Sequence, residues 1–442
     1  YSIDAARREC EWDLNQVTHV ADYLDYFEDQ QIKRLVHYFL LQYLTEVQPF
    51  LGQLRKSVIH NDANDHNLLV DQNRITGLID FGDMVYSHTV NNLAIACTYA
   101  MLSADDPLAC ATLVVKGYHR AFALSQQEVS LLYYLIGARL CISLAQSARN
   151  RAHSHPNPYR FLSEKPAREL LQKLIEINPL KAHGAFRQAC GFSAADASAL
   201  TDSLLKRRFR VLGHNLSLSY KDPLQIERGA LQYLYDTRGN TYVDCVNNVS
   251  HLGHCHPRLV QEMQGQIARL NTNTRYLHPT VVEYAEAILK TLPDKFSRCY
   301  FVNSGSEAND LAIRMARRHT GRDDVIVLDH AYHGTTSLAL GMSPYKYDGP
   351  GGFSPPAWVH KAQSPDLYRG PFTYDMPDAG KRYARDVECI INALASEGNA
   401  PAAFICESLL GVGGQMPLPE GYLREVYRII RAAGGLCIAD EV

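Results

Sequence analysis

Apolar residues recur with helical spacing through most of the first half of the chain. Residues 30–54 carry an apolar stripe through Leu35, Phe39 and Tyr43, which predicts an amphipathic helix. Short apolar runs interrupt this pattern and predict strands around tight loops over 57–60, 67–70 and 76–79. Further helices are predicted over 89–102, 107–123, 126–149, 163–177 and 194–210. This half is therefore predicted to be mainly helical.

The pattern changes after about residue 230. Residues 231–236 and 241–245 predict a hairpin with Gly239 at its turn. Helical stretches then alternate with buried apolar runs, which predict strands over 298–303, 324–328, 402–406 and 436–439. The helices are predicted over 257–270, 280–291, 306–319, 379–395 and 421–433. This alternation favours a mainly parallel sheet covered by helices, in which ligands bind at the carboxyl ends of the strands.

Composition is typical of a globular protein with more than one domain. The chain has 442 residues, of which 46% are hydrophobic and 21% charged, and this length suffices for about two to three domains. The net charge of −3 gives no reason to expect nucleic acid or membrane as a partner, and no apolar run approaches the roughly 20 residues of a membrane helix. The eleven cysteines contain no C-x-x-C pair, so we expect core thiols in a reducing cytoplasm.

Polar residues gather in the loop after the first predicted strand, in the order His60-x-Asp62-x-x-x-x-Asn67, and Asp80 follows the third strand. Phosphoryl transfer needs one carboxylate that orients a hydroxyl, and a second that holds Mg²⁺ with the help of an amide oxygen. Asp62 suits the first role, and Asn67 and Asp80 suit the second. Polar loop residues can also merely cap turns. The full spacing, with apolar strands on both sides, favours a phosphotransferase loop.

A second candidate site begins after residues 299–303, which predict a buried strand. A small turn, Ser304-Gly305-Ser306, joins this strand to the helix that follows. Bare backbone N–H groups and the positive end of a helix suit a phosphate group, and this turn offers both. Asp440 closes another apolar strand, where a carboxylate can keep a pyridinium nitrogen protonated and so make the ring an electron sink.

Two other stretches contain charged or metal-binding residue types. The run of basic residues at 206–210 is typical of a solvated helix face. The histidines and cysteine at 251–256 include zinc-ligand residue types, but their spacing is crowded for a tetrahedral site. Neither stretch therefore predicts a site of its own.

Residues 57–103 resemble the aminoglycoside phosphotransferase and choline kinase superfamily, and within it the hydroxylysine kinases, through VIHNDANDHN at 58–67 and GLIDFGD at 77–83. The resemblance implies ATP with Mg²⁺ and a small amino-alcohol acceptor. Asn61 stands where the superfamily usually has Gly, and Asn tolerates the left-handed conformation better than most residues. The small lobe of the family has no counterpart before Asp62, so residues 1–185 are interpreted as the carboxyl-terminal lobe alone.

Residues 216–442 resemble the class III aminotransferases of fold type I, through SGSEAN at 304–309, DHAYHG at 329–334 and ADEV at 439–442. The resemblance implies a pocket for pyridoxal 5′-phosphate and a homodimer formed through this domain. The implied positions are Gly305 and Ser306 at the phosphate, Tyr332 stacked on the ring, Glu407 near its phenolic side, Asp440 at the ring nitrogen and Val442 beneath it, with His333 as a weaker candidate.

The fold class predicted from both resemblances is an α/β multidomain chain. A mainly helical kinase-like lobe is followed by a linker at 186–215 and a partial fold type I α/β domain with a mainly parallel sheet. The lysine that carries the cofactor in this family lies downstream of the ADEV motif. The 216–442 region is therefore interpreted as truncated before that lysine.

The stretches LNTNTRYLH at 270–278 and SPYKY at 343–347 resemble the phospho-lyase branch of class III, which acts on O-phosphoethanolamine and 5-phosphohydroxylysine. The combination predicts an enzyme that phosphorylates a small amino alcohol and then eliminates phosphate and ammonia. Phosphate is a good leaving group and hydroxide a poor one, which gives this order a chemical reason. The alternative is a class III transaminase tethered to a non-catalytic or regulatory kinase-like domain.

Overall fold

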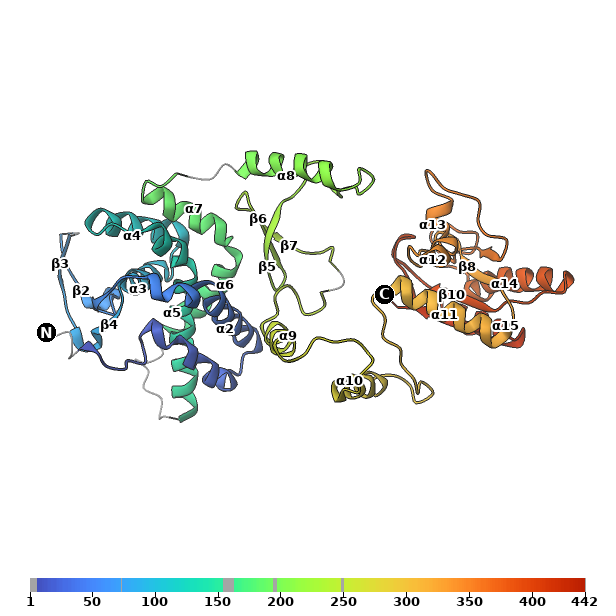
Figure 1. Cartoon of the computed structure of the whole chain (residues 1–442), viewed down its shortest axis with the longest axis horizontal. Helices are drawn as coiled ribbons and strands as arrows, with labels where there is room; N and C mark the ends of the chain where they lie inside the picture. Colours follow the sequence, from blue (N-terminus) through green and yellow to red (C-terminus); the bar gives the residue numbers. More distant parts are fainter. Residues whose placement is uncertain (1–5, 73, 154–162, 194–196, 248–249, 442) are drawn as a thin grey trace. The chain divides into compact units, whose positions relative to one another are not determined.

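The computed structural model describes residues 6–72, 74–153, 163–193, 197–247 and 250–441. The chain forms two compact units, Tyr1–Asn273 and Thr274–Val442 (Figure 1). Each unit contains its own clusters of buried apolar side chains, so each is described by itself. The domain boundaries proposed from the sequence, with a kinase-like lobe at 1–185, a linker at 186–215 and an aminotransferase domain at 216–442, stay a prediction.

Helices make up most of the first unit, as the apolar spacing predicted. The longest is α5 (Gln126–His153), which is long and apolar enough to cross a membrane by length and composition alone. However, 89% of its apolar window is buried inside the protein, which is typical of a core helix. The other elements of this region are η1 (Leu14–Tyr26), α2 (Gln30–Gln42), η2 (Tyr43–Val47), η3 (Gln48–Gln53), β1 (Lys56–Ile59), η4 (Asp65–Asn67), β2 (Leu68–Asp71), β3 (Arg74–Leu78), η5 (Phe81–Asp83), β4 (Val85–His88), α3 (Thr89–Met101), α4 (Pro107–Ala121), α6 (Glu164–Glu176), α7 (Pro179–Ala189), α8 (Ala197–Val211) and α9 (Pro257–Arg269).

A three-stranded antiparallel sheet, β5 (Ile226–Ala230), β6 (Tyr233–Asp236) and β7 (Thr241–Val243), packs on these helices. The hairpin of β6 and β7 was predicted, whereas β5 was not. Asn178, at the start of α7, is 1% exposed and donates hydrogen bonds to the carbonyl oxygens of Asp236 and Asn240, both at 2.9 Å. The buried Tyr235 donates its hydroxyl proton to the Ile175 carbonyl oxygen. Buried hydrogen bonds therefore fasten the hairpin to α6 and α7.

We expect Asn178→Ala to lower the free energy of unfolding of the first unit by about 3 kcal/mol. The carbonyl oxygens of Asp236 and Asn240 each lose one donor and keep one backbone N–H, and each lost hydrogen bond costs about 0.5–1.5 kcal/mol. Asn178 also caps α7 by accepting a hydrogen bond from Leu180 N–H at 2.8 Å, and losing a cap costs about 1 kcal/mol. Denaturant unfolding followed by circular dichroism measures the loss. The exposed Asn215→Ala should stay within about 0.5 kcal/mol of the wild type, and equal stabilities of the two variants would contradict this account.

The second unit contains a four-stranded parallel sheet in the order β13 (Leu436–Asp440), β10 (Ala403–Glu407), β8 (Val325–Leu328), β9 (Val359–Ala362). Apolar side chains alternate between its two faces: Ile326 and Phe404 pack with α14 and α15, and Val327 and Ile405 pack with α11 and α12. The predicted α/β architecture with a parallel sheet is thus confirmed. The remaining elements are α10 (Pro279–Leu289), α11 (Gly305–Thr320), α12 (Ser337–Gly341), α13 (Pro344–Tyr347), α14 (Ala379–Ser396), β11 (Leu409–Leu410), β12 (Met416–Pro417) and α15 (Tyr422–Ala432).

The strand predicted over residues 298–303 is wrong. This segment has no regular secondary structure, and Phe301 and Val302 are 48% and 40% exposed. An apolar run becomes a strand only where a neighbouring strand supplies hydrogen-bond partners. In the described part of the chain, β13 and β9 are the edges of the sheet and neither pairs with this segment. The Ser304-Gly305-Ser306 turn therefore begins α11 without following a strand.

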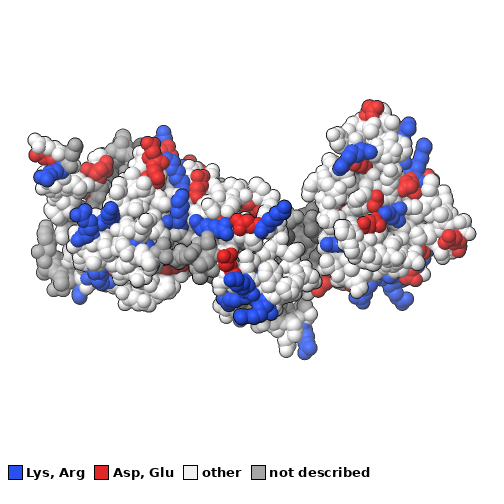
Figure 2. Space-filling view, turned by 90° about the horizontal axis from the view of Figure 1, so that it is seen from above, with Lys and Arg blue, Asp and Glu red and all other residues white. Residues whose placement is uncertain are grey.

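Basic and acidic side chains lie interspersed over most of the face drawn in Figure 2. This distribution follows from the near balance of 44 Lys and Arg against 47 Asp and Glu. Exposed ion pairs such as Lys33–Asp25, at 2.8 Å, are of the kind that contributes little to stability. The position of these charges therefore says little about the fold, and the two sites below depend on less exposed groups.

Candidate functional sites

The first candidate site is built around Asp62, whose side chain is 20% exposed. Its Oδ2 accepts hydrogen bonds from the side-chain amides of Asn64 and Asn67, both at 2.9 Å. Its Oδ1 lies 3.5 Å from Arg139 Nη2 and 3.4 Å from the Tyr99 hydroxyl. Four donors thus fix the orientation of a carboxylate that solvent can still reach, which is what a group that orients a hydroxyl requires.

The backbone of this loop is held by His60 and Asn61. His60 Nε2 lies 3.0 Å from the Ile79 carbonyl oxygen, and this contact holds the loop against the segment that follows β3. Asn61 has φ of 67°, the left-handed conformation that Asn tolerates, and it is fully buried. A Gly-like turn therefore forms here without Gly.

Asn67 and Asp80, the predicted metal ligands, lie on adjacent segments. Ile79 N–H donates to the Asn67 carbonyl oxygen at 3.0 Å, which brings Asp80 within one residue of this contact. Asn67 donates a hydrogen bond from its amide nitrogen to Asp62. Its amide oxygen is therefore left to act as a ligand for a cation. Among the described residues, no three or more His, Cys, Asp or Glu side chains form a metal cluster. This donor set therefore fits Mg²⁺ only as an ion that takes most of its ligands from nucleotide phosphates and water.

Several residues of this site were not singled out from the sequence, Tyr99 and Asn64 among them. Arg139 is 2% exposed and donates to the Trp12 carbonyl oxygen and the Tyr99 hydroxyl, both at 3.0 Å. A charged residue inside the apolar stretch of α5 was the signal that a buried partner must exist. Asp83 was quoted only as part of a motif. Burial, and then the negative charge of Asp62, raise the pKa of Asp83.

The second candidate site includes the amino terminus of α11. Ser304 caps this helix by accepting a hydrogen bond from Glu307 N–H at 3.2 Å. The first N–H groups of a helix have no partner within it, which leaves those of Gly305 and Ser306 for a phosphate. Ser306 Oγ accepts a hydrogen bond from Thr335 N–H at 3.1 Å, and a Cβ at Gly334 would collide with Ser306. The loop after β8 therefore closes against the predicted phosphate-binding turn.

Asp440 ends β13 and is 9% exposed. Its Oδ2 accepts hydrogen bonds from Asn309 Nδ2 at 2.8 Å and from His333 Nδ1 at 2.9 Å. Asn309 also donates to the His333 carbonyl oxygen at 3.0 Å, so the three side chains form one buried group. Asn309 was missed as a site residue, although a buried amide on the apolar face of α11 was the available signal. A carboxylate held in this way can keep a ring nitrogen protonated.

Tyr332 and Glu407 lie close together, as the motif positions implied. Tyr332 N–H donates to Glu407 Oε1 at 3.3 Å, and Gly411 N–H donates to Oε2 at 2.8 Å. Glu407 and Asp440 are aligned partners at the carboxyl ends of β10 and β13. Val442 lies outside the described residues. The remaining predicted residues therefore fit pyridoxal 5′-phosphate, with a phosphate turn and a buried carboxylate in one unit.

Two family models match the chain. The phosphotransferase enzyme family matches residues 2–126, and the class-III aminotransferase family matches residues 218–442. The second match covers half of the chain, and the protein belongs to the class-III aminotransferase family. Its first region is similar to phosphotransferases. Membership of this family supports pyridoxal 5′-phosphate as the cofactor.

Individual relatives agree with this assignment. The chain is 49% identical over 242 residues to "Alanine--glyoxylate aminotransferase 2-like" of Drosophila melanogaster, covering 54% of this chain and 49% of the relative. It is 40% identical over 274 residues to "Ethanolamine-phosphate phospho-lyase homolog 1" of Caenorhabditis elegans, covering 58% of each. A solved phospholyase from Arthrobacter in complex with phosphoethanolamine is similar, with 36% identity, a TM-score of 0.50 and coverage of 53% of this chain and 55% of that one. The chain spans about half the length of the curated relatives it matches.

Proposed function

We propose that the protein is a bifunctional enzyme. Its first region transfers phosphate from ATP to the hydroxyl of a small amino alcohol, and its second region removes phosphate and ammonia from the resulting ester. The observation that carries this proposal is that one chain contains two carboxylates, Asp62 and Asp440, each held in a fixed orientation by side-chain hydrogen bonds. The similarity to a phospho-lyase homolog and to a phospholyase bound to phosphoethanolamine supports the second step.

The first step depends on two separate tasks. Asp62 would orient the acceptor hydroxyl and accept its proton, because its carboxylate is fixed by four donors and still partly exposed. Asn67 and Asp80 would hold Mg²⁺ against the nucleotide phosphates. The transfer converts the alcohol and ATP into a phosphate ester and ADP.

In the second step, pyridoxal 5′-phosphate when bound supplies an electron sink for the carbon next to the amine. The N–H groups of Gly305 and Ser306 would bind the phosphate of the cofactor. Tyr332 would cover its ring, and Glu407 would lie near the phenolic side. Asp440 would hold a proton at the ring nitrogen, and His333 and Asn309 would orient Asp440 through their hydrogen bonds.

We favour elimination over amino transfer at the second site. Elimination from O-phosphoethanolamine consumes one water and releases acetaldehyde, ammonia and phosphate in equal amounts. Amino transfer needs a 2-oxo acid and leaves the phosphate ester intact. The complete protein, incubated with O-phosphoethanolamine or 5-phosphohydroxylysine without a 2-oxo acid, should therefore release phosphate and ammonia in a ratio of one to one.

The same incubation with an added 2-oxo acid separates the two outcomes. Phosphate release should stay unchanged, because the acceptor takes no part in elimination. Amino transfer that requires the oxo acid, without phosphate release, would overturn the lyase assignment. It would favour a class III transaminase whose kinase-like region is non-catalytic or regulatory, and ADP formation with amino alcohols would then be absent.

We further propose that the protein acts in the cytoplasm as a homodimer formed through its aminotransferase region. All eleven cysteines are free in the structure, which suits a reducing compartment. Residues 276–302 expose many large apolar side chains, including Leu277 at 95% and Tyr276 at 70%. Exposed apolar surface of this kind is typical of a protein–protein interface.

A further inference from the structure

The loops that carry Asp62 and Asp83 leave the same end of one two-stranded sheet. In this sheet β1 pairs with β4 in antiparallel orientation, and the pair at this end is Ile59 with Val85. Asp62 follows Ile59 by three residues, and Asp83 precedes Val85 by two. Residues that face each other in such a pair have Cα atoms about 4.5–5.5 Å apart. The two aspartates therefore start from neighbouring positions of the fold.

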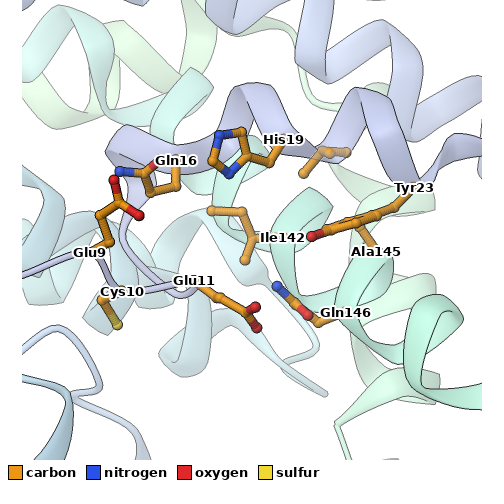
Figure 3. Close-up of a pocket in the computed structure, with 10 residues that line it drawn as sticks. Glu9, Cys10, Glu11, Gln16, His19, Tyr23, Ile142, Ala145 and Gln146 are labelled. Atoms are coloured by element: carbon orange, nitrogen blue, oxygen red, sulfur yellow. The ribbon is translucent and has the colours of Figure 1, made fainter. Parts of the chain in front are cut away.

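The extended segment before η1 contacts both loops. Arg8 donates hydrogen bonds to the carbonyl oxygens of Gly82 and Met84, which flank the second aspartate. Two residues later, the buried Cys10 accepts a hydrogen bond from Asn61 Nδ2 at 3.6 Å. Figure 3 shows Cys10 in this segment, beside a cavity of about 380 Å³ between η1 and α5. One short segment thus holds the loops of both aspartates in place.

Asp83 presents a carboxylate without a bonded partner. In the described part of the chain, this carboxylate has no hydrogen-bond or ion-pair partner, although the residue is partly buried. Burial raises the pKa of Asp83, and the negative charges of Asp62 and then Asp80 raise it further, while Arg139 and Arg8 act in the opposite sense. A carboxylate in such surroundings is stabilised by a positive group that pairs with it.

The predicted metal ligands belong to a different pair of strands. Asn67 directly precedes β2, and Asp80 follows β3 by two residues, so both lie at the open end of the β2–β3 hairpin. Asp62 and Asp83 lie at the end of the β1–β4 pair instead. The topology therefore groups Asp83 with the residue proposed to orient the acceptor hydroxyl, and not with the residues proposed to hold Mg²⁺.

We propose that Asp83 binds the ammonium group of the acceptor while Asp62 orients its hydroxyl group. This inference rests on the kinase activity proposed above. Ethanolamine and 5-hydroxylysine each carry an ammonium and a hydroxyl group on adjacent carbons, so two neighbouring carboxylates can hold both groups. Such an acceptor gives the vicinal phosphate ester that the second step consumes. A charge-assisted hydrogen bond is stronger than a neutral one, so Asp83 selects amino alcohols over diols.

The test compares ethanolamine with ethylene glycol, its neutral counterpart, as acceptors in ADP formation by the complete protein. The kcat/KM for ethanolamine should be at least about tenfold higher. Asp83→Asn should reduce this preference about tenfold, through KM for ethanolamine, and should leave KM for ATP and the Mg²⁺ requirement unchanged. Asp83→Glu keeps the charge and should retain more of the preference. Asp71→Asn, at an exposed position of β2, should behave as the wild type.

Binding measured by calorimetry without ATP separates this site from the kinase function. Ethanolamine should bind Asp83→Asn more weakly than Asp71→Asn, and this difference reports the first unit because the second site is the same in both variants. If binding depends on Asp83 but no amino alcohol yields ADP, the ammonium site stands and the proposed kinase function fails.

Three outcomes would overturn the ammonium site. The first is equal use of ethanolamine and ethylene glycol by the wild type. The second is equal affinity of Asp83→Asn and Asp71→Asn for ethanolamine. The third is a higher Mg²⁺ requirement in Asp83→Asn with an unchanged KM for ethanolamine, which would make Asp83 a metal ligand.

Discussion

Replacing Asp440 with alanine is expected to lower lyase turnover of the complete protein by about 100- to 1000-fold. The estimate corresponds to the removal of one preorganised electrostatic group from an active site. Without the carboxylate, the ring nitrogen of the cofactor loses the group that keeps it protonated, and the electron sink is weakened. Asn309 and His333 also lose their shared acceptor. Initial rates of phosphate release from O-phosphoethanolamine measure the effect.

Two control variants distinguish loss of the charge from loss of the fold. Asp440→Asn keeps the size of the side chain and should lose nearly as much activity as the alanine variant. Asp375→Ala removes an exposed aspartate that accepts a hydrogen bond from the Thr373 hydroxyl, and it should retain wild-type rates. The absorbance spectrum reports whether each variant still binds the cofactor. Near wild-type turnover by Asp440→Ala would exclude the proposed role of this residue.

The positions of Glu407 and Asp440 could be predicted because β10 and β13 have a strong local signal. Each is a short apolar run that ends in an acidic residue, and parallel pairing brings both acids to the same edge. The strand β9 was missed because its centre is His360-Lys361, which interrupts the apolar pattern. The segment 298–303 shows the opposite error, since an apolar run does not specify a partner strand.

The supporting residues of both sites could not be predicted from local patterns. Arg139 and Asp62 are 77 residues apart in the sequence, and Asn309 and Asp440 are 131 residues apart. The fold alone brings these pairs together. A buried polar residue in an apolar helix signals that a partner exists, but it does not say which one.

Replacing Asp62 with asparagine is expected to lower phosphate transfer to the amino alcohol by about 100- to 10,000-fold, the range for removal of a general base. The amide can still orient a hydroxyl, but it cannot accept the proton. Lyase activity on substrate that is already phosphorylated should stay at the wild-type rate, because all residues assigned to that reaction lie in the second unit. ADP formation and phosphate release, measured on the same preparation, report the two reactions separately.

Asp65→Asn is the matched control, since it makes the same change three residues further along the same loop, at an exposed position. It should retain both reactions, whereas Asp62→Asn should retain only the second. A loss of both reactions in Asp62→Asn would contradict two independent sites and indicate a single shared centre. If Asp62→Asn and Asp65→Asn form ADP at the same rate, Asp62 has no role as a base, and the polar residues of this loop serve only to shape its turns.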